Sequence, residues 1–145
     1  TRFVYGRTDV IHMLNGAIAG LVAITAEPLT PSPFAAILIG SVGGLIAVFG
    51  TKLLYKFKID DVVGAIPAHL FAGIWGTLAV PITNNEAAFS SQLIGVISIN
   101  IFVFVISFAI WFIIKQTFGI RLSVKAEKAG TDKSEVGVVA YAIRD

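Results

Sequence analysis

Four blocks of apolar residues, separated by short polar segments, dominate the pattern of the chain. They cover residues 10–26, 34–54, 62–82 and 93–114. A helix needs roughly 20 mainly apolar residues, at about 1.5 Å rise each, to cross a hydrocarbon core of about 30 Å. The pattern therefore predicts an all-α polytopic membrane protein with four transmembrane helices. We expect a membrane domain over residues 1–117 and a polar cytoplasmic tail over residues 118–145.

Composition supports this class and excludes several others. Of the 145 residues, 56% are hydrophobic and 14% are charged, whereas an ordinary soluble domain is about a quarter charged. The chain has no cysteine and two histidines, which excludes disulfides and cysteine-bound metal. It also lacks a phosphate-binding loop ending in GK, an HExxH pair and a GxSxG elbow. We therefore expect no enzyme, no cofactor and no metal site.

The distribution of basic residues predicts the orientation in the membrane. All 11 Lys and Arg residues lie before the first block, around the junction of the second and third, or after the fourth. The other two connections, EPLTPSP and TNNEAAFSS, contain none. The positive-inside rule makes the basic side cytoplasmic, so we expect both termini there. Because the charges are dispersed between apolar blocks, they give no reason to expect a nucleic-acid partner.

Small residues recur at four-residue spacing within the first three blocks. They are Gly16, Gly20, Gly40, Gly44, Ala68, Ala72 and Gly76. Helices in lipid associate by close packing, which small residues allow. The spacing predicts that the first three helices pack on one another, while the Phe- and Ile-rich fourth helix faces lipid.

His69 lies near the middle of the third predicted span, with Ala65 and Gly73 one turn away on its face. Ionisable groups at bilayer depth are costly and usually face a bundle interior or a cavity. One interpretation is a histidine that handles a proton or a ligand in a pore. The other is a histidine hydrogen-bonded between two helices. The small neighbours leave room beside the ring, which favours the pore.

Four more residues in or beside the predicted spans have special polarity or backbone chemistry. Asp60 and Asp61 stand at the start of the third block, where a carboxylate stabilises a helix N-terminus, and this capping role is favoured over a substrate site. Pro67 has no backbone N–H and predicts a kink or a freed carbonyl within the helix. Asn15 of the first block could donate a hydrogen bond across a helix interface.

Four collinear segments resemble ammonium transporters of the Amt/Mep/Rh class. The segment Ile59–Val80, IDDVVGAIPAHLFAGIWGTLAV, resembles the histidine-bearing tenth helix of that family, and Leu14–Ala26, LNGAIAGLVAITA, resembles the eighth. The glycine-rich second block resembles the ninth helix. The segment Phe118–Tyr141, FGIRLSVKAEKAGTDKSEVGVVAY, is similar to the start of the family's cytoplasmic tail. The resemblance covers essentially the whole chain and places it in the C-terminal portion, with the last four membrane helices.

The resemblance implies a fold and an activity. The family has eleven helices per subunit and forms homotrimers, and we expect this chain in the plasma membrane. The family's pore conducts ammonia past two facing histidines after deprotonation of ammonium, and His69 matches the second. We take as candidate pore residues His69, Ala65 and Asn15, and as structural residues Asp60, Asp61, Pro67 and Gly73. The family's tails transmit regulation and, in some members, meet a small signal-transduction protein.

Two other functions stay open at this point. The chain by itself could transport nothing and act as an assembly or regulatory fragment that needs the missing helices or a partner. It could also be an unrelated proton-coupled carrier with an intramembrane histidine. Flux that responds to protons but not to ammonium would favour the carrier.

Overall fold

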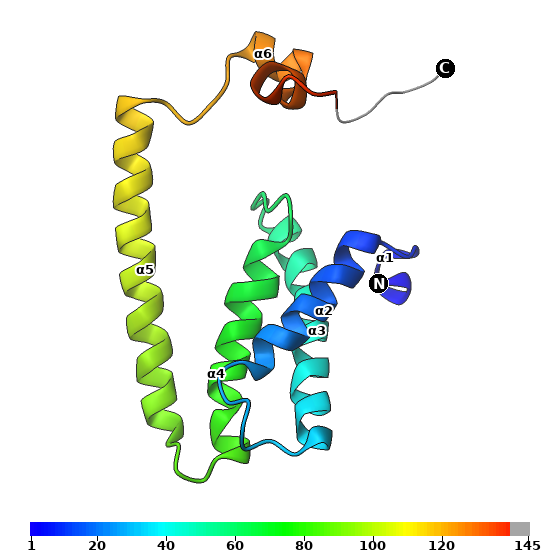
Figure 1. The fold of residues 1–145 in the computed structure, drawn as a ribbon, viewed down its shortest axis with the longest axis vertical. Coiled ribbons are helices and arrows are strands. Elements are labelled where there is room, and N and C mark those ends of the chain that lie inside the picture. Colours follow the sequence, from blue (N-terminus) through cyan, green and yellow to red (C-terminus); the bar gives the residue numbers. More distant parts are fainter. Residues whose placement is uncertain (140–145) are drawn as a thin grey trace. The chain divides into compact units, whose positions relative to one another are not determined.

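The computed structural model describes residues 1–139, and its regular elements there are all helical. They are α1 (Arg2–Tyr5), α2 (Val10–Ile24), α3 (Pro33–Lys56), η1 (Ile66–Phe71), α4 (Ala72–Thr83), α5 (Phe89–Thr117), α6 (Val124–Ala129) and η2 (Asp132–Val136), where η marks a π-helical segment (Figure 1). Contacts divide the chain into two units, Thr1–Asn100 and Ile101–Asp145. The last six residues of the predicted tail, 140–145, lie outside the described residues.

Three stretches of helix in the described chain are long and apolar enough to cross a membrane. They are Pro33–Lys56, Ile66–Thr83 and Phe89–Thr117. They correspond to the second, third and fourth apolar blocks, so the prediction is confirmed for these three in length and composition. The first block forms α2, an apolar helix of 15 residues, which at about 1.5 Å per residue is shorter than the bilayer core. The prediction of four full spans is therefore corrected to three spans and one shorter apolar helix.

Glycine allows α2 and α3 to approach backbone to backbone. A Cβ added at Gly20 would lie 3.1 Å from the carbonyl oxygen of Gly40. A Cβ added at Gly43 would lie 2.6 Å from the carbonyl oxygen of Ala19, which is too close for two non-bonded atoms. The four-residue spacing of small residues thus marks a real helix contact, as the sequence predicted.

The segment η1–α4 completes this bundle, and its core is built from small side chains. A Cβ added at Gly76 of α4 would collide with the backbone carbonyl of Ala23 of α2. Two buried clusters result, one of Ala19, Ala47, Ala68 and Ala72, and one of Ala23, Ile39 and Ala79. By contrast, α5 buries none of its residues in the described chain. The core therefore lies between α2, α3 and η1–α4.

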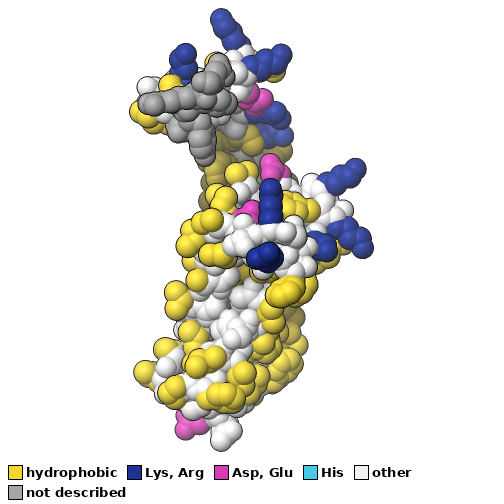
Figure 2. Space-filling view, turned by 90° about the vertical axis from the view of Figure 1, so that its right-hand side faces the viewer, with side chains coloured by type: hydrophobic (Ala, Val, Ile, Leu, Met, Phe, Trp, Pro, Cys, Tyr) yellow, Lys and Arg dark blue, Asp and Glu magenta, His cyan; other side chains and the backbone are white. Residues whose placement is uncertain are grey.

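Charged residues of the first unit lie at the ends of the bundle. The basic ones are Arg2, Arg7, Lys52, Lys56 and Lys58. Since α2 and α3 run antiparallel, the start of α2 and the end of α3 share one end (Figure 1). Figure 2 shows Lys and Arg side chains gathered at that end, together with acidic ones, whereas the opposite end shows acidic side chains without Lys or Arg. The apolar flanks between these ends match the pattern of a bundle that crosses a membrane.

The second unit contains a short capped helix and an ion pair. Ser123 Oγ accepts a hydrogen bond of 3.2 Å from the Ala126 N–H at the start of α6. Arg121 binds Glu127 twice, through Nε to Oε1 at 2.7 Å and Nη2 to Oε2 at 3.2 Å. Hydrogen bonding to Arg121 lowers the pKa of Glu127, and the same bond raises the pKa of Arg121. This bidentate pair joins the segment before α6 to the helix itself.

Candidate functional site

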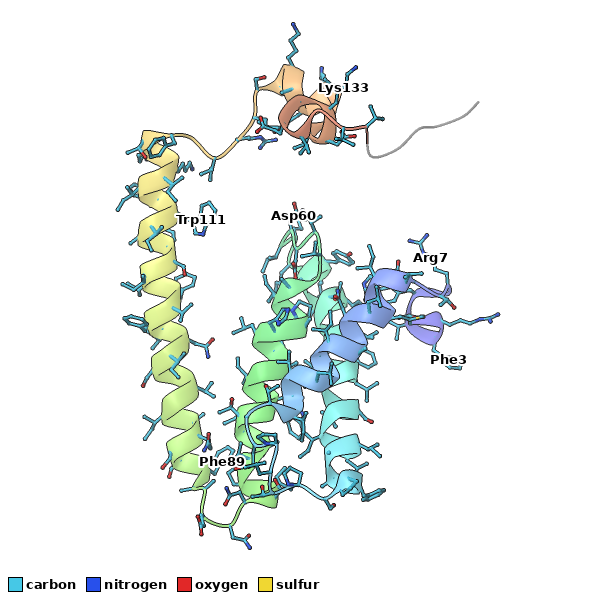
Figure 3. The ribbon with its side chains drawn as sticks, viewed as in Figure 1. Phe3, Arg7, Asp60, Phe89, Trp111 and Lys133 are labelled. Carbon is cyan, nitrogen blue, oxygen red and sulfur yellow. The ribbon has the colours of Figure 1, made fainter. Side chains whose placement is uncertain are left out.

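The candidate site begins where the helix that carries His69 begins, and Asp61 caps that helix. The two carboxylate oxygens of Asp61 accept hydrogen bonds of 2.9 Å from the N–H groups of Ala65 and Ile66. The first N–H groups of a helix have no partner within it, and a carboxylate there also interacts favourably with the helix dipole. Asp60 is exposed in the preceding loop, at the same end of the bundle as Arg7 (Figure 3). Of the two aspartates that the sequence offered as caps, Asp61 makes the bonds.

Pro67 stands in the first turn of this helix. The first backbone hydrogen bond of the helix runs from the Ala68 N–H to the Gly64 carbonyl and is 3.2 Å long. Residue 67 precedes that bond, so the missing N–H of Pro67 removes no hydrogen bond from the helix. The sequence placed Pro67 inside a helix that starts near residue 62; because the helix starts later, the freed carbonyl expected there does not arise. A π-helical turn follows instead, in which the Ala72 N–H reaches the carbonyl oxygens of both Pro67 and His69. Such turns often mark functional positions in helices.

Asn15 of α2 is bonded to the segment that precedes this helix. Its Nδ2 donates a hydrogen bond of 2.7 Å to the carbonyl oxygen of Val63. Gly64 follows with a φ of 73°, a left-handed conformation that glycine adopts without strain. A Cβ at Gly64 would also collide with Asn15 Nδ2. Asn15 therefore donates across a helix interface, and the direct pore contact expected for it stays a prediction.

His69 is exposed on an open groove of about 330 Å³ within the first unit. Its lining residues are His69, Leu70, Gly73, Ile74 and Thr77 from η1 and α4, and Gln92, Gly95, Val96, Ile99 and Asn100 from α5. Gly73, one turn beyond the histidine, leaves space beside the ring; the nearest atom that a Cβ there would meet is Val22 Cγ1 at 3.8 Å. The ring is therefore next to an open groove and is not part of the buried core.

Three polar side chains that sequence reasoning did not single out share the groove with His69. Thr77 lies about two turns further along the same helix face, while Gln92 and Asn100 come from α5. The amide of Asn100 donates to the carbonyl oxygen of Val96 in its own helix at 2.7 Å. The spacing of His69 and Thr77 could have indicated that they share a helix face. The sequence does not show which face of α5 lies opposite them. Ala65 is exposed one turn before the histidine and is not among the groove residues.

The second histidine, His12, lies at the start of α2 and is not part of this groove. Its Nδ1 is 2.9 Å from Asp9 Oδ1, and its ring centroid is 4.7 Å from that of Tyr5. Contact with the His12 side chain, followed by the hydrogen bond from the His12 N–H, lowers the pKa of Asp9. Within residues 1–139, no group of three His, Asp or Glu side chains is arranged to hold a metal ion.

The long apolar helices, their close packing through glycine and the charged ends together define an integral membrane protein of the polytopic helical class. Comparison with known proteins gives the family. The family described as Ammonium Transporter Family matches residues 1–141. The chain therefore belongs to the ammonium transporter family, whose members are transporters rather than enzymes. This confirms the family resemblance seen in the sequence.

Individual relatives agree with the family match. The chain is 38% identical over 156 residues to the ammonium transporter Amt2 of Archaeoglobus fulgidus, an alignment that covers 94% of this chain and 33% of that protein. It is 31% identical over 151 residues to an ammonium transporter of Bacillus subtilis, covering 93% and 37% respectively. It is 32% identical over 146 residues to Amt2 of Methanocaldococcus jannaschii, covering 95% and 35%. The chain thus spans about a third of the length of these relatives.

Proposed function

We propose that this chain forms part of an ammonium transport path in which ammonia crosses the membrane past His69. The observation that carries the proposal is the exposure of His69 on an open groove, beside Gly73 and lined largely by apolar residues. Membership of the ammonium transporter family supports ammonium as the substrate. In this proposal His69 lines the path within the groove, Ala65, exposed one turn earlier, lines its continuation, and Asn15 lies close to it.

The energetics favour passage of the neutral species. Ammonium is a hydrated cation, and moving a bare charge into an apolar medium costs many kcal/mol, whereas ammonia carries no charge. A neutral imidazole has one donor and one acceptor nitrogen, so His69 can accept a hydrogen bond from ammonia. An ammonium ion that transfers a proton to water at the mouth can therefore pass as ammonia. Potassium has no proton to lose and is excluded by chemistry rather than by size.

The same proposal treats the chain as the C-terminal portion of a larger transporter. The chain spans about a third of the length of these relatives, and the groove beside His69 is open. Further helices would close the groove and supply a second histidine that faces His69. We place the protein in the plasma membrane, as a homotrimer, with both termini of this chain in the cytoplasm because all the basic residues fall on that side. The tail from residue 118 onward would be the contact for a signal-transduction regulator.

Uptake measurements test the role of His69. Methylammonium or ammonium uptake is compared in cells that express the transporter containing this chain, with His69→Ala or with His12→Gln as a matched histidine outside the groove. We expect His69→Ala to reduce uptake or its selectivity against potassium, and His12→Gln to retain both. Uptake and selectivity that are unchanged in His69→Ala would remove this residue from the mechanism.

A second candidate function is an assembly or regulatory chain that does not conduct by itself; the chain spans about a third of the length of the relatives it matches. Reconstitution of the 145 residues in liposomes separates the two. Ammonium-dependent flux supports a self-sufficient path, whereas flux that appears only after the remaining helices are added supports the fragment. We expect no flux from the chain alone.

A further inference from the structure

We propose that Asn15 is a positioning residue for His69, a role that for its transport readout rests on the function proposed above. The side-chain amide of Asn15 holds the carbonyl of Val63, from which the chain turns into the helix that carries His69. Nothing in this role requires Asn15 to touch the transported molecule. It acts through the backbone on the placement of the imidazole.

The first step concerns the turn before the helix, which is hydrogen-bonded to the start of the helix. The Asp61 carboxylate accepts from the N–H groups of Ala65 and Ile66, each at 2.9 Å. The Gly64 N–H in turn donates to the Asp61 carbonyl at 3.3 Å. These bonds join the turn 61–64 to the first turn of the helix, so the two move as one piece. None of them connects that piece to the rest of the bundle.

The second step is the link to the bundle. In the described chain, the bond from Asn15 Nδ2 to the Val63 carbonyl is the hydrogen bond that joins α2 to this turn, across 48 residues of sequence at 2.7 Å. An amide that donates to a carbonyl at this distance makes a well-formed hydrogen bond. Because the turn and the helix start are one piece, holding Val63 sets the height and rotation of the turn that carries His69, together with the packing of Ala68 in the core.

The third step is that the backbone is shaped to receive the amide. Gly64, next to Val63, has a φ of 73° and no side chain, and an added Cβ would collide with Asn15 Nδ2. The left-handed conformation and the empty space are both needed for the amide to reach the carbonyl. Asn15 and Gly64 therefore form one unit, and substitutions at the two positions should not be additive.

Histidine NMR tests the positioning directly, because the chain has only two histidines. In a His12→Gln background, a ¹⁵N-histidine label reports the tautomer and surroundings of His69 alone. The chain is measured in lipid nanodiscs with Asn15→Leu, and with Asn84→Leu as the matched control. The Asn84 amide also joins two elements, by a bond of 2.9 Å to Glu27 Oε2, but at the other end of α4.

We expect Asn15→Leu to shift or broaden the ¹⁵N signals of His69 and Asn84→Leu to leave them in place. Gly64→Ala should reproduce the change, and the double variant should add little to it. Circular dichroism of each variant checks that the helix content is retained. Signals of His69 that are unchanged in well-folded Asn15→Leu, or changed equally in Asn84→Leu, would overturn the proposal.

Transport separates positioning from direct pore lining. Aspartate has the shape of asparagine but cannot donate when ionised, so positioning predicts that Asn15→Asp and Asn15→Leu slow uptake to the same extent. We expect about a threefold loss or more, the population change that one average interhelical hydrogen bond in a membrane sets. Uptake by Asn15→Asp that equals or exceeds the unsubstituted level would overturn positioning. If His69→Ala has no effect on uptake while the NMR changes stand, the proposed function fails and the positioning geometry survives.

Discussion

The indole Nε1 of Trp75 donates a hydrogen bond of 3.0 Å to the carbonyl oxygen of Ile39 and so joins α4 to α3. Trp75→Phe keeps an aromatic ring but removes the N–H donor together with the pyrrole part of the indole. We expect it to lower the free energy of unfolding by about 1 kcal/mol, within the range of interhelical hydrogen bonds in membrane proteins. Unfolding in mixed micelles, followed by circular dichroism, measures the change. Trp111→Phe is the matched control, since that side chain is 60% exposed, and an equal loss in both variants would contradict the prediction.

A methyl group at Gly43 should be costly, because it would meet the Ala19 carbonyl oxygen at 2.6 Å and Ala23 Cβ at 2.7 Å. We expect Gly43→Ala to lower the free energy of unfolding by about 1–3 kcal/mol, as overpacking of a close contact does. The control is Gly16→Ala, where an added Cβ has nothing within 4 Å. That substitution should be neutral or slightly stabilising, because alanine favours helix. Equal stability of both variants would show that α2 and α3 do not touch as described.

The stability of the loop after α2 should depend on pH through the ionisation of Glu27. A hydrogen bond from the Asn84 side chain, followed by one from the Leu29 N–H, lowers the pKa of Glu27 below its ordinary value of 4.5. A lowered pKa in the folded chain stabilises that state above pH 4.5, and the contribution is lost as the pH falls through the folded value. Carboxyl ¹³C shifts of Glu27 during titration measure this. Asn84→Leu should raise the pKa toward 4.5, whereas Ser41→Ala in α3 should leave it unchanged.

The pH dependence of the tail should have the same sign and should arise from the pair Arg121 and Glu127. The bidentate contact with Arg121 lowers the pKa of Glu127, so the ordered segment around α6 is favoured above the ordinary pKa of the carboxylate and weakens as the pH falls through the lowered one. We expect Arg121→Gln to raise the pKa of Glu127 and to make backbone amide shifts of α6 less sensitive to acid. Because both partners are exposed, high salt should reduce the effect. A pKa of Glu127 that is unchanged in Arg121→Gln would contradict the pairing.

The membrane helices could be predicted from the sequence because their cause is local. In lipid every backbone N–H and C=O must be bonded within the protein, so a long apolar block has to be helical. The second, third and fourth apolar blocks correspond to α3, to the helical stretch that ends at Thr83 and to α5, which are all long and apolar. The first block was predicted too long, since α2 ends at Ile24. The residue at which a helix ends is hard to predict, because a turn can replace the last helical residues.

The sequence suggested residues for the candidate site but not the contacts between them. His69, Gly73 and Asp61 could be singled out because polar, small and acidic residues stand out within an apolar block. The start of the third helix was placed too early, since the turn before it depends on the left-handed Gly64, and glycine alone does not reveal its φ. The partners of His69 in the groove, Gln92 and Asn100, come from a helix whose facing side the sequence does not show.

By itself, the sequence determined that the chain is a helical membrane protein, which end of the bundle carries the basic residues and which family it belongs to. These properties depend on hydropathy, charge and local motifs, each of which can be read along the chain. Only the tertiary structure decided that Asn15 bonds to Val63 and that His69 is exposed on a groove. The reason is that both depend on how closely and in what register α2 packs against its neighbours, and that is set by contacts between residues far apart in the chain.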